Sequence, residues 1–163
     1  MKNDYISEIY EKDKLVLHPY ENFNDRGTYN RKLIAKSDNI YLYDENGNKF
    51  IDGPGGMWCN NIGHGNREIG EAIKDQIDKM DYCSPFSEST EVSAELASVL
   101  ADLSPGDLNT VFFTSDGSTA NETALRFVMF YNNILGKPNK KHIITRDKAY
   151  HGSTYLTGSI TGK

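Results

Sequence analysis

The sequence is poor in cysteine and holds no long apolar run. Its two cysteines, Cys59 and Cys83, lack CxxC spacing, which argues against a zinc site and against a disulfide framework. The four histidines lie far apart in the sequence, so we expect no metal site. No apolar stretch approaches the length of a membrane span, and the polar start lacks the core of a signal peptide. We therefore expect a cytoplasmic protein with no membrane partner.

Positive charge is also scarce. The chain has 18 lysines and arginines against 23 acidic residues, and its formal net charge is −5. No cluster of basic residues offers a track for a phosphate backbone, so we expect no nucleic-acid partner. With 163 residues, of which 37% are hydrophobic, the chain is long enough for one globular unit with a modest core.

A strand, a small-residue turn and a helix are predicted in residues 111–126. Thr119 and Glu122 have the spacing of a capping box, which favours a helix that begins near Ser118. The N–H groups at such a helix start can bind an anion, and the small residues Gly117 and Ser118 would admit one. The same pattern fits an ordinary turn whose hydroxyls only cap a helix, so a second site has to decide between the two.

The second site is residues 149–154, with the sequence Ala-Tyr-His-Gly-Ser-Thr. It follows a predicted strand at 141–145, and another is predicted at 110–114. Two strands joined through one helix imply parallel pairing in an α/β sheet, with the ligand site at their carboxyl ends. We therefore expect residues 115–119 to meet Tyr150 and His151 in space.

Apolar periodicity predicts the remaining elements. Residues 31–51 alternate as antiparallel strands, with a turn at 44–47. Apolar stripes at helical spacing predict further helices, at residues 4–12, 66–80, 89–103 and, after the small-residue turn, up to about 135. Because so few strands are encoded, we expect exposed apolar surface and unpaired sheet edges.

The small-residue turn and the Tyr-His-Gly motif, in this order and at this separation, resemble those of the class III aminotransferases. These are pyridoxal-phosphate enzymes of fold type I. Residues 52–65 resemble the active-site opening of the same family, particularly the amine:pyruvate or omega-transaminase branch with its Trp58–Cys59 pair. The resemblance runs from about Leu17 to the chain end and covers about the front third of such an enzyme.

The resemblance implies an α/β fold in two parts. Residues 1–62 would form an N-terminal helix and a small-domain β-meander, and residues 63–163 the first, incomplete part of the αβα sheet of the large domain. The family assembles as homodimers, so a homodimer is implied for the full-length enzyme.

The resemblance also implies transfer of an amino group from an amine or amino acid to a 2-oxo acid such as pyruvate, with pyridoxal phosphate as cofactor. Tyr150 would stack on the cofactor ring and His151 would support it, while Glu122 would either support the site or cap Thr119. The implied cofactor contacts are Ser115, Gly117, Ser118, Glu122, Tyr150 and His151. The implied substrate pocket is lined by Tyr20, Trp58 and Phe86.

In this family the Schiff-base lysine and the aspartate that pairs with the pyridine nitrogen lie well downstream of the Tyr-His-Gly motif. No lysine here has that context, so no catalytic residue is assigned and this chain alone is expected to be inactive. A catalytically incomplete remnant, or an interaction module that keeps the phosphate site, stays an alternative. A nucleotide-phosphate binder is disfavoured, because neither the glycine runs nor residues 158–163 match a nucleotide fingerprint.

Overall fold

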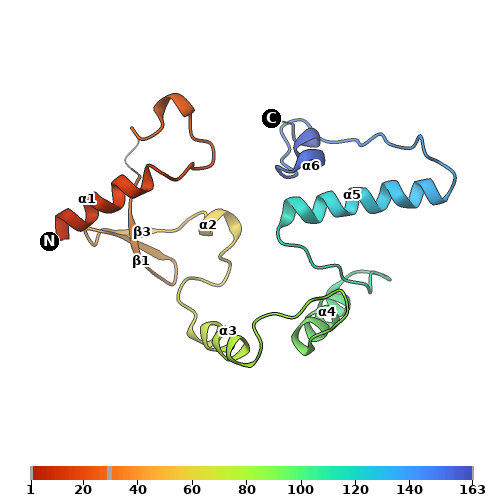
Figure 1. The fold of residues 1–163 in the computed structure, drawn as a ribbon, viewed down its shortest axis with the longest axis horizontal. Coiled ribbons are helices and arrows are strands. Elements are labelled where there is room, and N and C mark those ends of the chain that lie inside the picture. Colours follow the sequence, from red (N-terminus) through yellow and green to blue (C-terminus); the bar gives the residue numbers. More distant parts are fainter. Residues whose placement is uncertain (1, 29–30, 163) are drawn as a thin grey trace. The chain divides into compact units, whose positions relative to one another are not determined.

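The structure is a computed structural model that describes residues 2–28 and 31–162 (Figure 1). The chain divides into two units, residues 1–82 and 83–163. The expected domain boundary at residue 62 stays a prediction. The first unit contains α1 (Lys2–Asp13), η1 (Phe23–Asp25), β1 (Ile34–Asp38), β2 (Tyr41–Asp44), β3 (Lys49–Ile51), α2 (Gly55–Trp58) and α3 (Arg67–Lys79). The second contains α4 (Glu91–Leu103), α5 (Gly117–Ile134) and α6 (Tyr155–Ile160).

The sheet of the first unit is an antiparallel meander in the order β1-β2-β3, which confirms the strands predicted in residues 31–51. Asp44 starts the turn between β2 and β3, where its Oδ1 accepts the backbone N–H groups of Asn46 at 3.0 Å and Asn48 at 2.8 Å. The Asn48 side chain also donates to this carboxylate and is the main cause of the lowered pKa of Asp44. Gly47 has a φ of +85° that favours glycine. The predicted turn at 44–47 is therefore present.

The helices begin where side chains can satisfy their free N–H groups. Asn66 accepts a hydrogen bond from the backbone of Ile69 at the start of α3, and Thr90 accepts one from Ser93 at the start of α4. The predicted helices at 66–80 and 89–103 are thus confirmed to within two residues at each end. No helix in residues 2–28 and 31–162 is long and apolar enough to cross a membrane.

The two strands predicted for the second unit do not form. Residues 110–114 and 141–145 carry no strand in the described structure, so the expected parallel pairing between them is wrong. A strand exists through ladder hydrogen bonds to a neighbour, and a βα connection does not specify which strand that neighbour is. The apolar character of these two segments was therefore not enough to predict that they pair with each other.

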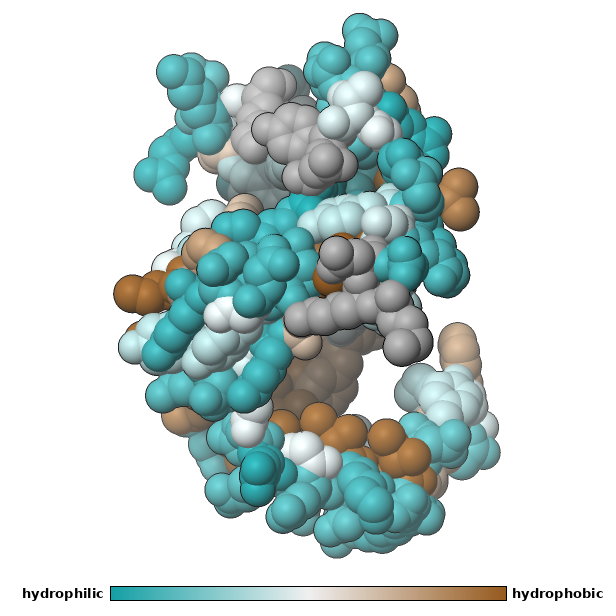
Figure 2. Space-filling view, turned by 90° about the vertical axis from the view of Figure 1, so that its left-hand side faces the viewer, coloured by the Kyte–Doolittle hydropathy of each residue, from teal (hydrophilic) through white to brown (hydrophobic). Residues whose placement is uncertain are grey.

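No apolar side chain is buried among the described residues. The apolar stripe of α3 is one example of this exposure. Its residues Ile69, Ile73 and Ile77 are 44%, 55% and 57% exposed. Figure 2 shows such side chains, in brown, lying open on the face in view. The exposed apolar surface expected from the sequence is therefore present.

Candidate active site

The first turn of α5 begins at Gly117, as the small-residue turn predicts, and Asp116 caps it. The Asp116 Oδ1 accepts the backbone N–H of Thr119 at 2.9 Å, and the Thr119 hydroxyl accepts the backbone N–H of Asp116 at 3.2 Å. This is a capping box, but it closes between Asp116 and Thr119 and not between Thr119 and Glu122. The Thr119 N–H is also the main reason why the pKa of Asp116 is lowered.

The start of α5 meets the loop that carries Tyr150 and His151. Ser118 Oγ accepts the backbone N–H of Ser153 at 3.2 Å, across 35 residues of sequence. Asn121 Nδ2 donates to the carbonyl oxygen of His151 at 2.8 Å. The convergence of these two stretches is therefore confirmed, although the strands expected to position them are missing.

Glu122 completes this junction. One oxygen of its carboxylate accepts the Thr154 hydroxyl at 2.5 Å and the backbone N–H groups of Leu156 and Thr157 at 3.1 and 3.3 Å. Its charge therefore lies at the N-terminus of α6, where an anion is stabilised. These bonds, led by that of the Thr154 hydroxyl, lower the pKa of Glu122. Glu122 thus holds α6 and is not the capping partner of Thr119.

The lowered pKa of Glu122 predicts how this contact responds to acid. Its stabilisation should be complete above the ordinary carboxyl pKa of about 4.3 and should disappear as pH falls through the lower folded-state pKa. The measurement is the amide shift of Leu156 by NMR from pH 7 downward. Glu122→Gln should abolish this transition, whereas Glu71→Gln, on exposed α3 surface, should keep it. The same transition in Glu122→Gln would contradict the assignment.

Gly152 lets the loop approach α5 closely. Its φ of +140° is one that side chains rarely adopt. A Cβ placed there would lie 2.5 Å from the Thr157 Oγ1 and 2.8 Å from the Ser118 Oγ. Thr157 itself is fully buried. The backbone at Gly152 therefore fills the space between α5 and α6, and only glycine fits there.

The remaining residues of the predicted cofactor site lie around this junction. His151 Nε2 lies 2.8 Å from the Thr145 hydroxyl, and the Tyr150 hydroxyl lies 3.1 Å from the Ser153 hydroxyl. Tyr150 is 56% exposed. Ser115 donates its hydroxyl to Asp116 at 3.1 Å. The roles of these residues toward a cofactor stay predictions.

Trp58 stands at the end of an unusual turn. All four residues of α2 have positive φ values of 53°, 60°, 61° and 68° from Gly55 to Trp58, so α2 is a left-handed turn. This conformation costs about 1–2 kcal/mol for each residue with a Cβ, here Met57 and Trp58. Trp58 is 76% exposed. Strain of this kind is found mostly at functional sites.

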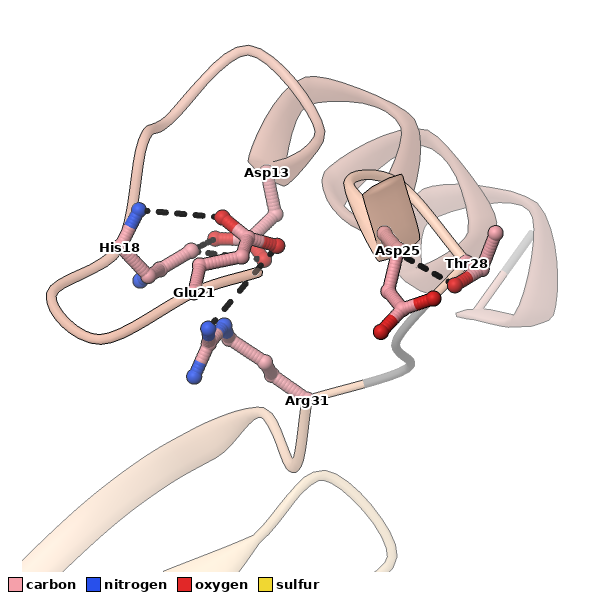
Figure 3. A network of polar contacts seen from close by, with 6 residues as sticks. All are labelled: Asp13, His18, Glu21, Asp25, Thr28 and Arg31. Atoms are coloured by element: carbon pink, nitrogen blue, oxygen red, sulfur yellow. Dashed lines mark hydrogen bonds and ion pairs between the residues drawn. The ribbon is translucent and has the colours of Figure 1, made fainter. Parts of the chain in front are cut away.

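Tyr20 also has a positive φ, of 61°, at the tip of a turn after α1. The turn is held from both sides by Glu21, which accepts the backbone N–H of His18 at 3.2 Å and pairs with Arg31 at 4.0 Å (Figure 3). His18 Nε2 in turn lies 3.1 Å from the Asp13 carboxylate. Figure 3 also shows Thr28 bound to the backbone of Asp25.

Phe86, the third predicted pocket residue, lies in the second unit and is 98% exposed. The pocket role of Tyr20, Trp58 and Phe86 stays a prediction.

Sequence reasoning missed Asn121 and the threonines around α6. A signal was available, because Ser118, Asn121 and Glu122 stand at positions i, i+3 and i+4 and therefore share one face of a helix. Three polar side chains on one face at the start of a helix indicate a polar partner.

Comparison with known proteins decides the family. The family model described as aminotransferase class-III matches residues 24–163. The chain belongs to the class III aminotransferases. Proteins of this family depend on pyridoxal phosphate, so this cofactor is expected.

Named members of the class III aminotransferases are similar to the chain in sequence. It is 38% identical to the putrescine–pyruvate aminotransferase of Pseudomonas aeruginosa, over 88% of this chain and 31% of that protein. It is 40% identical to the vanillin aminotransferase of Capsicum annuum, over 80% of this chain and 29% of that protein.

A solved transaminase structure shares the fold. The crystal structure of a transaminase from the marine bacterium Virgibacillus matches with a TM-score of 0.90 and 39% identity, over 95% of this chain and 36% of that one. The expected fold type I architecture is therefore correct. The chain spans about a third of the length of these relatives.

Proposed function

We propose that this chain supplies the phosphate-binding and ring-binding residues of a transaminase that uses pyridoxal phosphate. The observation that supports this most directly is the junction between α5 and the Tyr150–His151 loop. The bond from Ser153 to Ser118 joins a helix start, which favours an anion, to a loop that carries a partly exposed tyrosine. A phosphate ester carried by a flat aromatic ring matches both features.

The residues at the junction fit this cofactor. A Cβ added at Gly117 would have no described atom within 4 Å, so the backbone at Gly117 leaves space for a ligand. Ser118 Oγ accepts from Ser153, and a hydroxyl that accepts one hydrogen bond can still donate its own hydrogen. Gly117 and Ser118 would hold the phosphate, and Tyr150 would cover the ring.

Pyridoxal phosphate, when bound, supplies the electron sink that makes amino-group transfer possible. The residues of this chain bind and orient it. Ser118 donates to the phosphate, Asn121 and Glu122 hold the loop that presents Tyr150, and His151 is fixed by Thr145. We propose that the reactive lysine and the aspartate that protonates the pyridine ring come from residues outside this sequence.

We further propose an amine donor with an aromatic or alkyl group, and pyruvate as acceptor. Tyr20, Trp58 and Phe86 are large aromatic residues exposed to solvent, and such residues suit a substrate pocket for an apolar group. The name of one relative pairs putrescine, an alkyl diamine, with pyruvate, and the name of another contains vanillin, an aromatic aldehyde that can only accept an amino group. A homodimer is proposed for the complete enzyme.

The function is tested in a hybrid in which this chain replaces the matching third of the Virgibacillus transaminase. With pyridoxal phosphate and pyruvate, kcat/KM for 1-phenylethylamine should exceed that for glutamate about tenfold or more, because aromatic side chains favour an apolar group over a second carboxylate. Trp58→Ala should lower kcat/KM for the aromatic amine, while Tyr82→Ala should not. A preference for glutamate contradicts the pocket, and a hybrid inactive with every amine contradicts the function.

A further inference from the structure

The loop between β3 and α3, which carries Trp58, is closed at its base by the turn between β1 and β2. Asp52, directly after β3, donates its backbone N–H to the carbonyl oxygen of Ile40 at 2.8 Å. At the other end of the loop, His64 and Asn39 exchange two backbone hydrogen bonds, of 2.7 and 3.0 Å. Because residues 39 and 40 are adjacent, Asp52 and His64 are brought face to face.

The side chains of these two residues then bind each other. His64 Nε2 lies 2.8 Å from Asp52 Oδ2, and the Asp52 side chain is only 7% exposed. The other carboxylate oxygen, Oδ1, accepts the backbone N–H of Gly56 at 3.3 Å. One carboxylate therefore links the base of the loop to its interior. Such a shielded, charge-assisted hydrogen bond is stronger than a bond between neutral groups.

The backbone between these contacts is the left-handed turn Gly55–Trp58. Within it, the backbone N–H of Trp58 donates to Pro54 O at 2.8 Å, and that of Asn60 donates to Gly55 O at 2.9 Å. A left-handed turn that includes Met57 and Trp58 persists only when surrounding contacts over-determine it. Asp52 reaches into this turn twice, because its carboxylate accepts the Gly56 N–H and its backbone carbonyl oxygen accepts the Gly55 N–H at 3.2 Å. Of these two contacts, only the first depends on the side chain.

We infer that Asp52 and His64 are positioning residues that hold Trp58 in the strained conformation in which it meets the amine substrate. The inference rests on the proposed role of Trp58 in the substrate pocket. The pair acts through the backbone of the turn and touches neither substrate nor cofactor. It thereby sets the shape of the pocket, and so the specificity for the donor.

Amide hydrogen exchange of the hybrid transaminase that carries this chain, measured by mass spectrometry with fragmentation that resolves single amides, tests this inference. The reporter is the Trp58 N–H inside the turn, and the reference is the Asp44 N–H, which donates to Asn48 O at 3.1 Å in the same unit. In Asp52→Ala and His64→Ala, protection of the Trp58 N–H should fall about tenfold or more, and the reference should not change. His64→Gln should keep most of the protection, because its amide can still donate to the carboxylate. The matched control is Asp38→Ala, which removes an exposed carboxylate of β1.

Three results would overturn the inference. The first is equal protection of Trp58 in Asp52→Ala and in the parent hybrid. The second is a Trp58 N–H in the parent hybrid that exchanges as fast as in urea. The third is an equal loss of protection at the Trp58 and Asp44 N–H groups, which would mean that Asp52 stabilises the whole sheet. None of these readouts needs cofactor or turnover. The activity of the hybrid therefore tests the proposed function separately from this inference.

Discussion

Ser118→Asp should abolish the binding of pyridoxal phosphate to this chain. The parent chain should bind the cofactor weakly and without a covalent bond, in a saturable absorbance titration. The new carboxylate would lie against the phosphate, and two unit charges about 4 Å apart near a protein surface repel by about 4 kcal/mol. After screening by salt, that still lowers affinity by about a hundredfold or more.

Ser118→Asp tests the effect of the added charge on cofactor binding, because it should not disturb the fold. An aspartate at position 118 can still accept the Ser153 N–H, and a negative charge in the first turn of α5 suits the helix dipole. Ser118→Ala is the matched control, since it loses one hydroxyl and should weaken binding by only about 1 kcal/mol. Pyridoxal without phosphate should bind poorly to all three proteins. Unchanged affinity in Ser118→Asp, or stoichiometric lysine-linked cofactor after borohydride reduction, would contradict the proposed phosphate site.

The second large effect concerns association. We expect the 163-residue chain to self-associate and to unfold over a broad range of denaturant, because no apolar side chain is buried among its described residues. Such surface is stabilised only when another surface covers it. Size-exclusion chromatography with light scattering and a urea titration would measure both properties.

A single charge on an apolar stripe should reduce the association. Ile73 lies in the exposed stripe of α3, so Ile73→Glu should shift the chain toward smaller species. Ala72→Glu adds the same charge one residue away, outside this stripe, and should change little. A monodisperse monomer that unfolds in one cooperative step would show that the chain is an independent domain, and the interaction-module alternative would then gain weight.

Local signals predicted much of this structure. The meander, the starts of α3 and α4 and the turn at Gly117 all follow from patterns within a few residues, where caps and periodicity act directly. The meeting of Ser118 with the Tyr150 loop was predicted from the carboxyl ends of two parallel strands. The meeting is confirmed, although those strands are absent from the described residues.

What failed depends on partners distant in sequence. The strands at 110–114 and 141–145 need neighbours that their own residues do not specify. For Glu122 the sequence left two alternatives open, support of the site or a local cap of Thr119, because its partner, the start of α6, lies 32–35 residues away. The sequence allows a left-handed turn to be expected at Gly55 and Gly56, because glycine adopts positive φ values easily. Nothing in Met57 or Trp58 predicts a positive φ.

The bond between Ser118 and Ser153 has a consequence for the order of events during synthesis. Ser118 leaves the ribosome 35 residues before the backbone group that binds its hydroxyl. Until residues 151–157 emerge, α5 carries only half of the site, and closing a loop of this length costs little additional entropy over a shorter one. The start of α5 is therefore synthesised before the loop that holds Tyr150, so the proposed phosphate contacts would be present in the nascent chain before the residue proposed to cover the ring.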